Sequence, residues 1–371
     1  MRHYNIPIFI PHQGCPFQCV YCDQKIIASQ LEAPSARDVS EIIERHLSTI
    51  PLQAAEVEIA FFGGSFTAID QELQEEYLRA AAPYLRGGRV SGLRLSTRPD
   101  CIDEDTLMFL ARHGVKTIEL GVQSLNNQVL KMSARGYQAA DVFKACQLIK
   151  VHGFRLGVQL MIGLPGDNKA RDMETTDLAI GLTPDMVRIY PTVVIAGTWL
   201  EKAFRRGEYQ PLDLDEAVVI SKDMYLRFSA AGIRVIRMGL QPGDELSREG
   251  NVAAGPFHPS FGELVLQGVF RDQARMLMEA YISRVEPQRV LQLWVNPRDI
   301  SLMVGQHRNN ILALTNQFRL ESLTVKKQDT IDRNQIGISR PEMQEPEMLM
   351  GQGDLLERVK HESRQSTGRI G

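Results

Sequence analysis

The chain has 371 residues, of which 43% are hydrophobic and 23% charged, and its net charge at pH 7 is −3. These values are ordinary for a globular protein and give no reason to expect a global attraction for nucleic acid. No stretch approaches the roughly 18 uninterrupted apolar residues of a membrane helix, and the N-terminus is too weakly basic and apolar for a signal peptide. We therefore expect a cytoplasmic protein with no membrane partner.

Strand-like and helix-like segments alternate from the start of the chain. Candidate strands lie at 6–11, 56–62, 92–96, 116–122, 154–162 and 185–190, and helical patterns between them include 36–50, 71–85 and 103–114. This alternation predicts an α/β fold with a parallel sheet. Six such units predict a partial (β/α)6 TIM-like barrel, and residues 233–238 are a candidate seventh strand.

Polar and glycine-rich stretches follow the candidate strands. In chain order they include "GGSFT", "STRPD", "GVQS", "GLPGD" and "YPTVV". A (β/α) barrel carries its active site at the C-terminal ends of its strands. We therefore expect the functional site at this end of the barrel.

The alternation of strands and helices stops near residue 240, and this change predicts the domain boundaries. Residues 1–240 are expected to form the barrel, and residues 241–283 a loop across its mouth followed by a linking helix. Residues 284–340 are expected to form a small α/β unit. The polar residues 341–371 are expected to be a mobile tail.

Three of the five cysteines are clustered in the stretch "GCPFQCVYC", as Cys15, Cys19 and Cys22. A structural zinc site needs four protein ligands, and His12 is a candidate for the fourth. A [4Fe–4S] cluster is normally held by four thiolates, so three leave one iron open to another ligand. Spacing alone leaves both metals open.

The two remaining cysteines, Cys101 and Cys146, stand alone, so the sequence predicts no disulfide framework. Cys146 lies in a helical pattern and is expected to be a buried free thiol.

The pattern Cys15-x3-Cys19-x2-Cys22, with Tyr21 before the last cysteine, resembles the signature of the radical S-adenosylmethionine (radical SAM) superfamily. The resemblance implies that the three cysteines ligate a [4Fe–4S] cluster whose open iron binds S-adenosyl-L-methionine. It also implies reductive cleavage of that cofactor to a 5′-deoxyadenosyl radical, with an electron donor of the flavodoxin or ferredoxin type. No catalytic residue beyond the cluster ligands is assigned.

Further motifs extend this resemblance to about residue 265. The stretch "FFGGSFTAI" is similar to the family's glycine motif, which implies that Gly63, Gly64 and Ser65 lie against the cofactor. The stretches "STRPD", "ELGVQSLNNQVLKMSARGY" and "VQLMIGLPGD" resemble the Elp3-like and oxygen-independent coproporphyrinogen-oxidase-like branch. By that likeness, the remaining cofactor-binding residues are Tyr21, Ser96, Gln123, Arg135, Gln159 and Val193.

Three of these positions carry a specific expectation. The resemblance implies that Arg135 pairs with the methionyl carboxylate of the cofactor. The alternative is that Arg135 is a solvated arginine at the end of a helix. Position 96 is usually Glu in those relatives and position 159 is often Asp, whereas here they are Ser96 and Gln159. Neutral hydrogen-bonding groups are therefore expected to contact the cofactor.

The order strand, helix, turn, helix, strand in residues 289–327 resembles the core of a KH RNA-binding module. Such modules clamp RNA with a GxxG loop, which here reads Gly305-Gln306-His307-Arg308, with Arg in place of the second glycine. Residues 284–340 hold nine Lys or Arg against five Asp or Glu. The candidate RNA-binding residues are Gly305, His307, Arg308, Lys326 and Lys327. A small unit that only caps the open barrel edge is the alternative.

The leading hypothesis is a radical SAM enzyme that modifies RNA, with tRNA as the first candidate. Elp3 proteins act on the wobble uridine of tRNA and add an acetyltransferase domain that this sequence does not show, so we expect no acetyl-CoA-dependent reaction. Two alternatives remain. One is a radical SAM enzyme acting on a small porphyrin-like molecule, and the other is a non-catalytic iron–sulfur or zinc scaffold protein.

Overall fold

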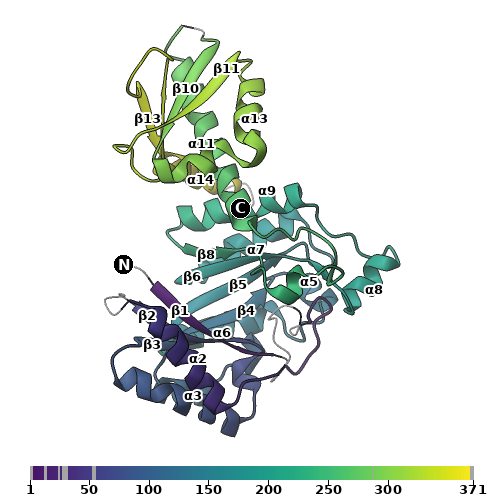
Figure 1. Ribbon diagram of the computed structural model, residues 1–371. Coiled ribbons are helices and arrows are strands. Elements are labelled where there is room, and N and C mark those ends of the chain that lie inside the picture. Colours follow the sequence, from purple (N-terminus) through teal and green to yellow (C-terminus); the bar gives the residue numbers. More distant parts are fainter. Residues whose placement is uncertain are drawn as a thin grey trace. The chain divides into compact units, whose positions relative to one another are not determined.

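The computed structural model describes residues 3–11, 15–23, 26, 32–51, 56–286 and 288–367 (Figure 1). The chain forms two compact units. The first comprises Met1–Leu214 and Ile233–Pro259, and the second comprises Asp215–Gly232 and Ser260–Gly371.

The first unit is built on a seven-stranded, all-parallel sheet with the order β1-β2-β3-β4-β5-β6-β8. The strands are β1 (His3–Ile10), β2 (Glu56–Gly63), β3 (Gly92–Thr97), β4 (Val115–Gln123), β5 (Arg155–Ile162), β6 (Met186–Pro191) and β8 (Arg234–Met238). Figure 1 shows them side by side. The partial TIM-like barrel is thus confirmed, with residues 234–238 as the seventh strand.

Helices connect these strands, as parallel pairing requires. They are α2 (Ala36–Thr49), α3 (Gln71–Arg86), α4 (Glu104–Arg112), α5 (Asn127–Met132), α6 (Ala139–Val151), α7 (Lys169–Gly181) and α8 (Trp199–Arg205), and the short helix α10 (Asp244–Ser247) follows the last strand, β8. A short antiparallel pair, β7 (Val194–Ile195) with β9 (Val252–Ala254), lies beyond the sheet. Leu246 and Phe257 pack with Val193 and Ile195, so the segment after β8 is ordered against the barrel mouth.

The pleat of each strand separates a core-facing set of residues from a set that faces the barrel interior. In β1, Ile6 and Ile8 are fully buried in the hydrophobic core. Their neighbours Asn5, Pro7 and Phe9 line an interior cavity instead. Sequence alternation within each strand therefore decides which side chains can reach the site.

The second unit combines a four-stranded sheet with helices. Its strands, in the order β11-β10-β12-β13, are β10 (Val290–Val295), β11 (Ser322–Lys327), β12 (Gln335–Ser339) and β13 (Met348–Gly351). Its helices are α9 (Leu214–Ala230), α11 (Phe261–Ile282), α12 (Ile300–Val304), α13 (Asn309–Gln317) and α14 (Gln352–Thr367). The segment β10-α12-α13-β11 reproduces the predicted order of strand, helix, turn, helix and strand.

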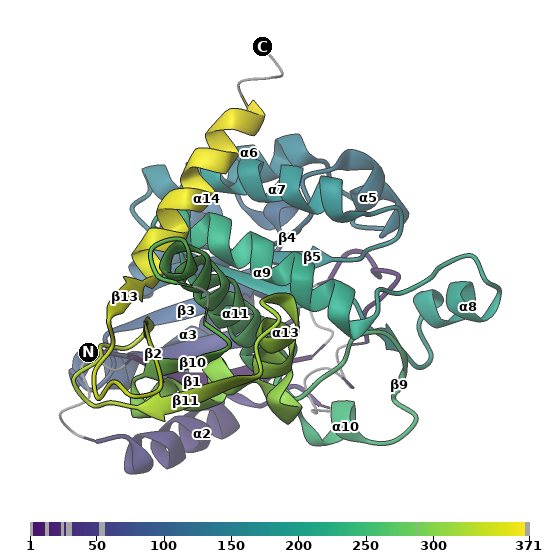
Figure 2. The ribbon, with the colours of Figure 1, turned by 90° about the horizontal axis from the view of Figure 1, so that it is seen from above.

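The predicted boundaries at 240 and 284 differ from this division, because α9 and α11 pack together within the second unit. Leu226 of α9, Val269 of α11 and Leu355 of α14 form one buried cluster. Figures 1 and 2 show these three helices close together.

Residues 348–367 of the predicted polar tail contain a strand and a helix. Strand β13 pairs antiparallel with β12, and Met348 and Met350 pack on the core of the second unit. Helix α14 follows and buries Leu355. Its sequence is polar overall, so its few apolar residues form no clear helical period in the sequence.

None of the helices in the described part of the chain is long and apolar enough to cross a membrane.

Candidate active site

A cavity of about 1250 Å³ opens at the C-terminal ends of the strands of the first unit. All twelve residues predicted to hold the cluster or the cofactor line it: Cys15, Cys19, Tyr21, Cys22, Gly63, Gly64, Ser65, Ser96, Gln123, Arg135, Gln159 and Val193. These residues come from segments spread over almost 180 positions of sequence. The fold therefore brings together the whole set that the motifs predicted.

The three clustered cysteines face this cavity from the segment after β1. The backbone N–H of Cys22 donates to the carbonyl oxygen of Cys19 at 3.1 Å, and the Cys15 sulfur lies 3.6 Å from the hydroxyl of Ser65. Burial raises the pKa of the Cys22 thiol, an effect that a bound metal would oppose by taking the thiolate.

The spacing of three thiolate sulfurs around a metal centre depends on whether they bind a single ion or a cluster. Two thiolates on one zinc lie at most about 4.6 Å apart, since each Zn–S bond is about 2.3 Å long. In a [4Fe–4S] cluster each thiolate binds a different iron, so wider spacing is required. The candidate fourth zinc ligand, His12, lies outside the described residues.

Arg135 is buried beside these thiols and is not a solvated helix-end residue. Only 6% of it is exposed. Its Nη1 lies 3.0 Å from the Cys19 sulfur and 3.2 Å from the Tyr21 hydroxyl, and its Nη2 donates to the Gly121 carbonyl at 2.7 Å. No carboxylate within the described ranges forms an ion pair with it. A buried cation without a carboxylate suits a site that gains negative charge when thiolates or an anionic ligand bind.

Gly63 is a position at which only glycine fits. Its φ is +110°, and a Cβ there would lie 2.7 Å from the carbonyl oxygen of Ile10. The neighbouring Gly64 N–H donates to that same oxygen at 2.8 Å. The glycine motif thus holds the end of β2 against the end of β1, directly before the cysteine segment.

The two neutral positions, Ser96 near the end of β3 and Gln159 within β5, contact each other. Gln159 Nε2 donates to Ser96 Oγ at 3.2 Å and to Glu119 Oε2 at 3.1 Å. Gln123, at the end of β4, has a φ of +67° and follows a break in the β4–β5 register. Such local strain and bulging re-aim side chains near functional sites.

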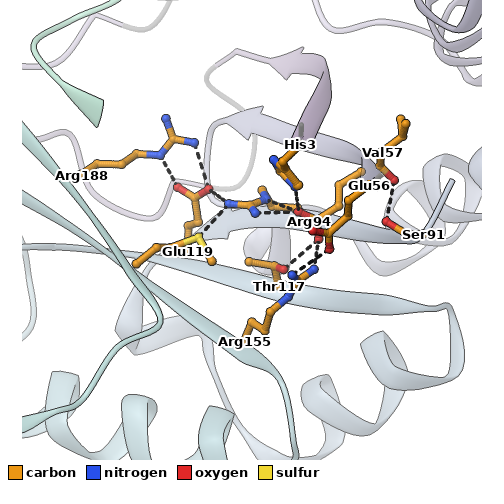
Figure 3. A network of polar contacts seen from close by, with 11 residues as sticks. His3, Glu56, Val57, Ser91, Arg94, Thr117, Glu119, Arg155 and Arg188 are labelled. Carbon is orange, nitrogen blue, oxygen red and sulfur yellow. Dashed lines mark hydrogen bonds and ion pairs between the residues drawn. The ribbon is translucent and has the colours of Figure 1, made fainter. Parts of the chain in front are cut away.

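A network of buried charges lies deeper in the barrel (Figure 3). Arg94 joins Glu58 to Glu119, with nitrogen–oxygen distances of 2.6 and 2.7 Å. Arg155 donates to Glu58 at 2.7 Å, and Arg188 donates to Glu119 at 2.6 Å. Burial favours the neutral acid, but hydrogen bonds from His3 and Arg94 outweigh it and lower the pKa of Glu58 to about 2.

Local sequence motifs did not predict this network, although charged residues within the apolar strands are a signal for it. Glu58, Arg94, Glu119 and Arg188 each stand within an apolar strand at an interior-facing position. His3, Glu56 and Glu58 bring ligand atoms within 4.8 Å of one another, as a metal site would. The carboxylate oxygens of Glu58 already accept from Arg94, Arg155, Thr117 and His3. We therefore assign this group to the network.

The candidate RNA-binding residues lie in the second unit. The loop Gly305–Arg308 connects α12 to α13, and both His307 and Arg308 are exposed with positive φ values of +50° and +62°. The Gln306 N–H donates to Gln267 Oε1 at 3.0 Å, which ties the loop to α11. Lys326 Nζ lies 5.0 Å from the Trp294 ring centre, and Lys327 is exposed.

Residues 9–179 match the model of the radical SAM superfamily, and residues 184–269 match that of the radical SAM C-terminal domain. These two models together span most of the chain, which therefore belongs to the radical SAM superfamily.

Within the superfamily the chain is Elp3-like. It is 32% identical over 188 residues to a tRNA uridine(34) acetyltransferase of Methanocaldococcus jannaschii, covering 44% of this chain and 34% of that one. It is 29% identical over 185 residues to human Elongator complex protein 3, again covering 44% of this chain and 34% of the other. An uncharacterized protein of M. jannaschii is 30% identical over 58% of this chain and 64% of its own length. The chain thus spans about a third of the two named relatives.

The fold of the archaeal Elp3 of Methanocaldococcus infernus is also similar. That structure superposes with a TM-score of 0.58 at 24% identity, over 73% of this chain and 63% of the other. The likeness agrees with the half-barrel observed here.

Proposed function

We propose that this radical SAM enzyme modifies RNA, with tRNA as its substrate, and that Cys15, Cys19 and Cys22 hold its [4Fe–4S] cluster. The observation that carries the proposal is the cavity itself. Three thiols, a buried arginine and the polar ends of β3, β4 and β5 face one space of about 1250 Å³. When bound, the cluster supplies the electron that cleaves S-adenosylmethionine reductively.

The chain's own residues would orient the cofactor and shield it from water. Arg135 offers positive charge beside Cys19, and it is fixed by hydrogen bonds to Tyr21, Tyr137 and Gly121. Gln159 and Ser96 present neutral hydrogen-bonding groups from neighbouring strands. Burial of these groups strengthens their electrostatic effect, because little water screens them.

Two observations favour RNA over a small porphyrin-like molecule. The Elp3-like relatives are named for tRNA uridine or for the Elongator complex. The second unit adds an exposed loop with His307 and Arg308 between two helices, as a KH module does. A basic loop of this kind would bind RNA phosphates.

Mass spectrometry of total RNA from cells that lack the protein tests the proposal. We expect the loss of one modified nucleoside, which wild-type protein and Cys146→Ala restore and Cys19→Ala does not. Cys146 is a matched control, because it is a buried free cysteine in α6, apart from the cavity. An RNA modification profile identical to that of wild-type cells would refute the proposed substrate.

Metal analysis separates the enzyme from a scaffold protein. A reconstituted chain should contain about four irons and four sulfides, and replacement of all three clustered cysteines by Ala should abolish both the brown chromophore and cleavage of S-adenosylmethionine. One zinc per chain, or cleavage that survives in the triple variant, would contradict the cluster assignment.

A further inference from the structure

Two arginines lie side by side in the cavity, and the motifs assign neither of them a role. Arg188 of β6 and Arg237 of β8 are paired in register on neighbouring strands. Both line the cavity, as does Tyr190, two residues after Arg188. Like charges placed next to each other are unfavourable unless anions compensate both.

The charge of Arg188 is paired with a carboxylate. Its Nε and Nη2 donate to the two carboxylate oxygens of Glu119 at 2.6 and 3.0 Å, an arrangement drawn in Figure 3. Its guanidinium also stacks on Phe62, 5.3 Å from the ring centre. Arg188 is therefore held in place and has little capacity left for a further anion.

The charge of Arg237 is not compensated. Its single hydrogen bond runs from Nε to the Gly239 carbonyl at 3.1 Å, and no carboxylate in the part of the chain that the structure covers forms an ion pair with it. Asp244 lines the same cavity without pairing with this arginine. Partial burial and the nearby charge of Arg188 lower the pKa of Arg237, so its charged form is stabilised poorly by the protein alone.

An anion from outside the protein would neutralise the positive charge of Arg237. The Nη atoms of Arg237 remain as donors in the planar arrangement that matches phosphate. Tyr190 lines the same cavity two residues after Arg188, and its hydroxyl is a further possible donor to an anion there. The cavity has room for a second ligand, since its 1250 Å³ exceeds the roughly 300–1,000 Å³ of a pocket for one small molecule.

We propose that Arg237, with the Tyr190 hydroxyl, binds a phosphodiester group of the RNA nucleotide that enters the cavity. The inference rests on the proposed function, because RNA is the substrate assumed. Phe9 and Phe62 add aromatic surface to the same cavity, with ring centres 6.2 Å apart. Aromatic side chains are the usual stacking partners of an unpaired base.

The test measures the affinity of the reconstituted enzyme for total tRNA as a function of salt concentration. Loss of one phosphate contact to a single-stranded nucleotide lowers the slope of log affinity against log salt by about 0.7. We expect this decrease for Arg237→Gln, whereas Arg237→Lys should keep the wild-type slope because it keeps the charge. Arg234→Gln is the matched control, since Arg234 is an exposed arginine on the same strand.

Three results would overturn the inference. They are a wild-type slope and affinity in Arg237→Gln, an equal loss in Arg234→Gln, and loss of S-adenosylmethionine binding in Arg237→Gln, which would place the guanidinium at the cofactor. Failure of wild-type enzyme to bind RNA would count against the proposed function instead. Calorimetry with inorganic phosphate then decides whether Arg237 forms an anion site: binding to wild type that Arg237→Gln abolishes supports it, and no binding to wild type refutes it.

Discussion

The Nη1 atom of Arg135 lies 3.0 Å from the sulfur of Cys19, although the two residues are 116 positions apart in sequence. The contact places a buried positive charge next to a predicted cluster ligand. The same guanidinium also donates to Gly121, Tyr21 and Tyr137, so its position is fixed from several sides. Positive charge at this distance favours the thiolate form that iron binds.

Replacement of Arg135 should therefore reduce both iron binding and stability. We expect Arg135→Gln to retain less iron and sulfide per chain after reconstitution, and to lose about 1–3 kcal/mol of stability because its buried hydrogen bonds to Gly121, Tyr21 and Tyr137 are lost. Arg135→Lys should be intermediate, because it keeps the charge and loses the planar fork. Iron analysis and thermal unfolding measure the two effects, and a fully loaded, equally stable Arg135→Gln would refute this role.

Glu58 should make the fold sensitive to acid. Its pKa is about 2 in the folded chain and about 4.3 in an unfolded one, so its stabilisation is complete above the unfolded value and is lost as the pH falls toward 2. The difference corresponds to about 3 kcal/mol.

The variant Glu58→Gln should therefore be about 3–5 kcal/mol less stable at pH 7 and should show a flatter decline in acid. Urea unfolding between pH 2 and pH 7 measures both. Glu41→Gln is the control, because Glu41 forms an exposed ion pair with Arg37. Equal pH profiles for wild type and Glu58→Gln would show that the network contributes nothing to acid stability.

The buried carboxyl of Asp172 should make the fold less stable as the pH rises, whereas Glu58 makes it less stable as the pH falls. Burial, together with the neighbouring carboxylate of Asp167, raises the pKa of Asp172 to about 9. Its Oδ2 has no hydrogen-bond partner within the described residues. The unfolded chain ionises this group near pH 3.9, so the stability of the fold should decrease as the pH rises from about 4 to about 9.

Asp172→Asn should remove this dependence and stabilise the fold at pH 8 by roughly 1–3 kcal/mol, because the buried group no longer has to be kept neutral. Denaturant unfolding at pH 5 and pH 8 provides the comparison. Glu174→Gln removes an exposed carboxylate from the same helix and should leave the profile unchanged. A stability gain that is equal at both pH values would argue against a protonated Asp172.

Charge reversal in the Gly305–Arg308 loop tests the second unit. If the loop contacts RNA phosphates, Arg308→Glu should weaken tRNA binding and lower the salt slope by about 1. Arg284→Glu makes the same charge change at an exposed residue after α11. Filter binding across a salt series measures the tRNA affinity of both variants. An equal loss of affinity in the two would show that the loop makes no specific contact with RNA.

The sequence by itself determined the family, and it named a set of candidate site residues that the fold brings to one cavity. The three-cysteine spacing and the motifs after each strand depend on local residue order, which is legible without a structure. The twelve residues that these motifs named all line one cavity. Alternation of strands and helices likewise predicted the half-barrel, because each strand is a separate apolar run.

Tertiary structure alone decided which charges meet. Glu58, Arg94, Glu119 and Arg188 come from four strands, and only the sheet register brings them together. The same register places Arg237 beside Arg188, which no local pattern indicates. Strand β13 and helix α14 were missed for a related reason: their few apolar contacts are made with distant segments of the chain. Local sequence shows which residue types follow each strand. Which charged side chains pair between strands is decided only when the chain folds.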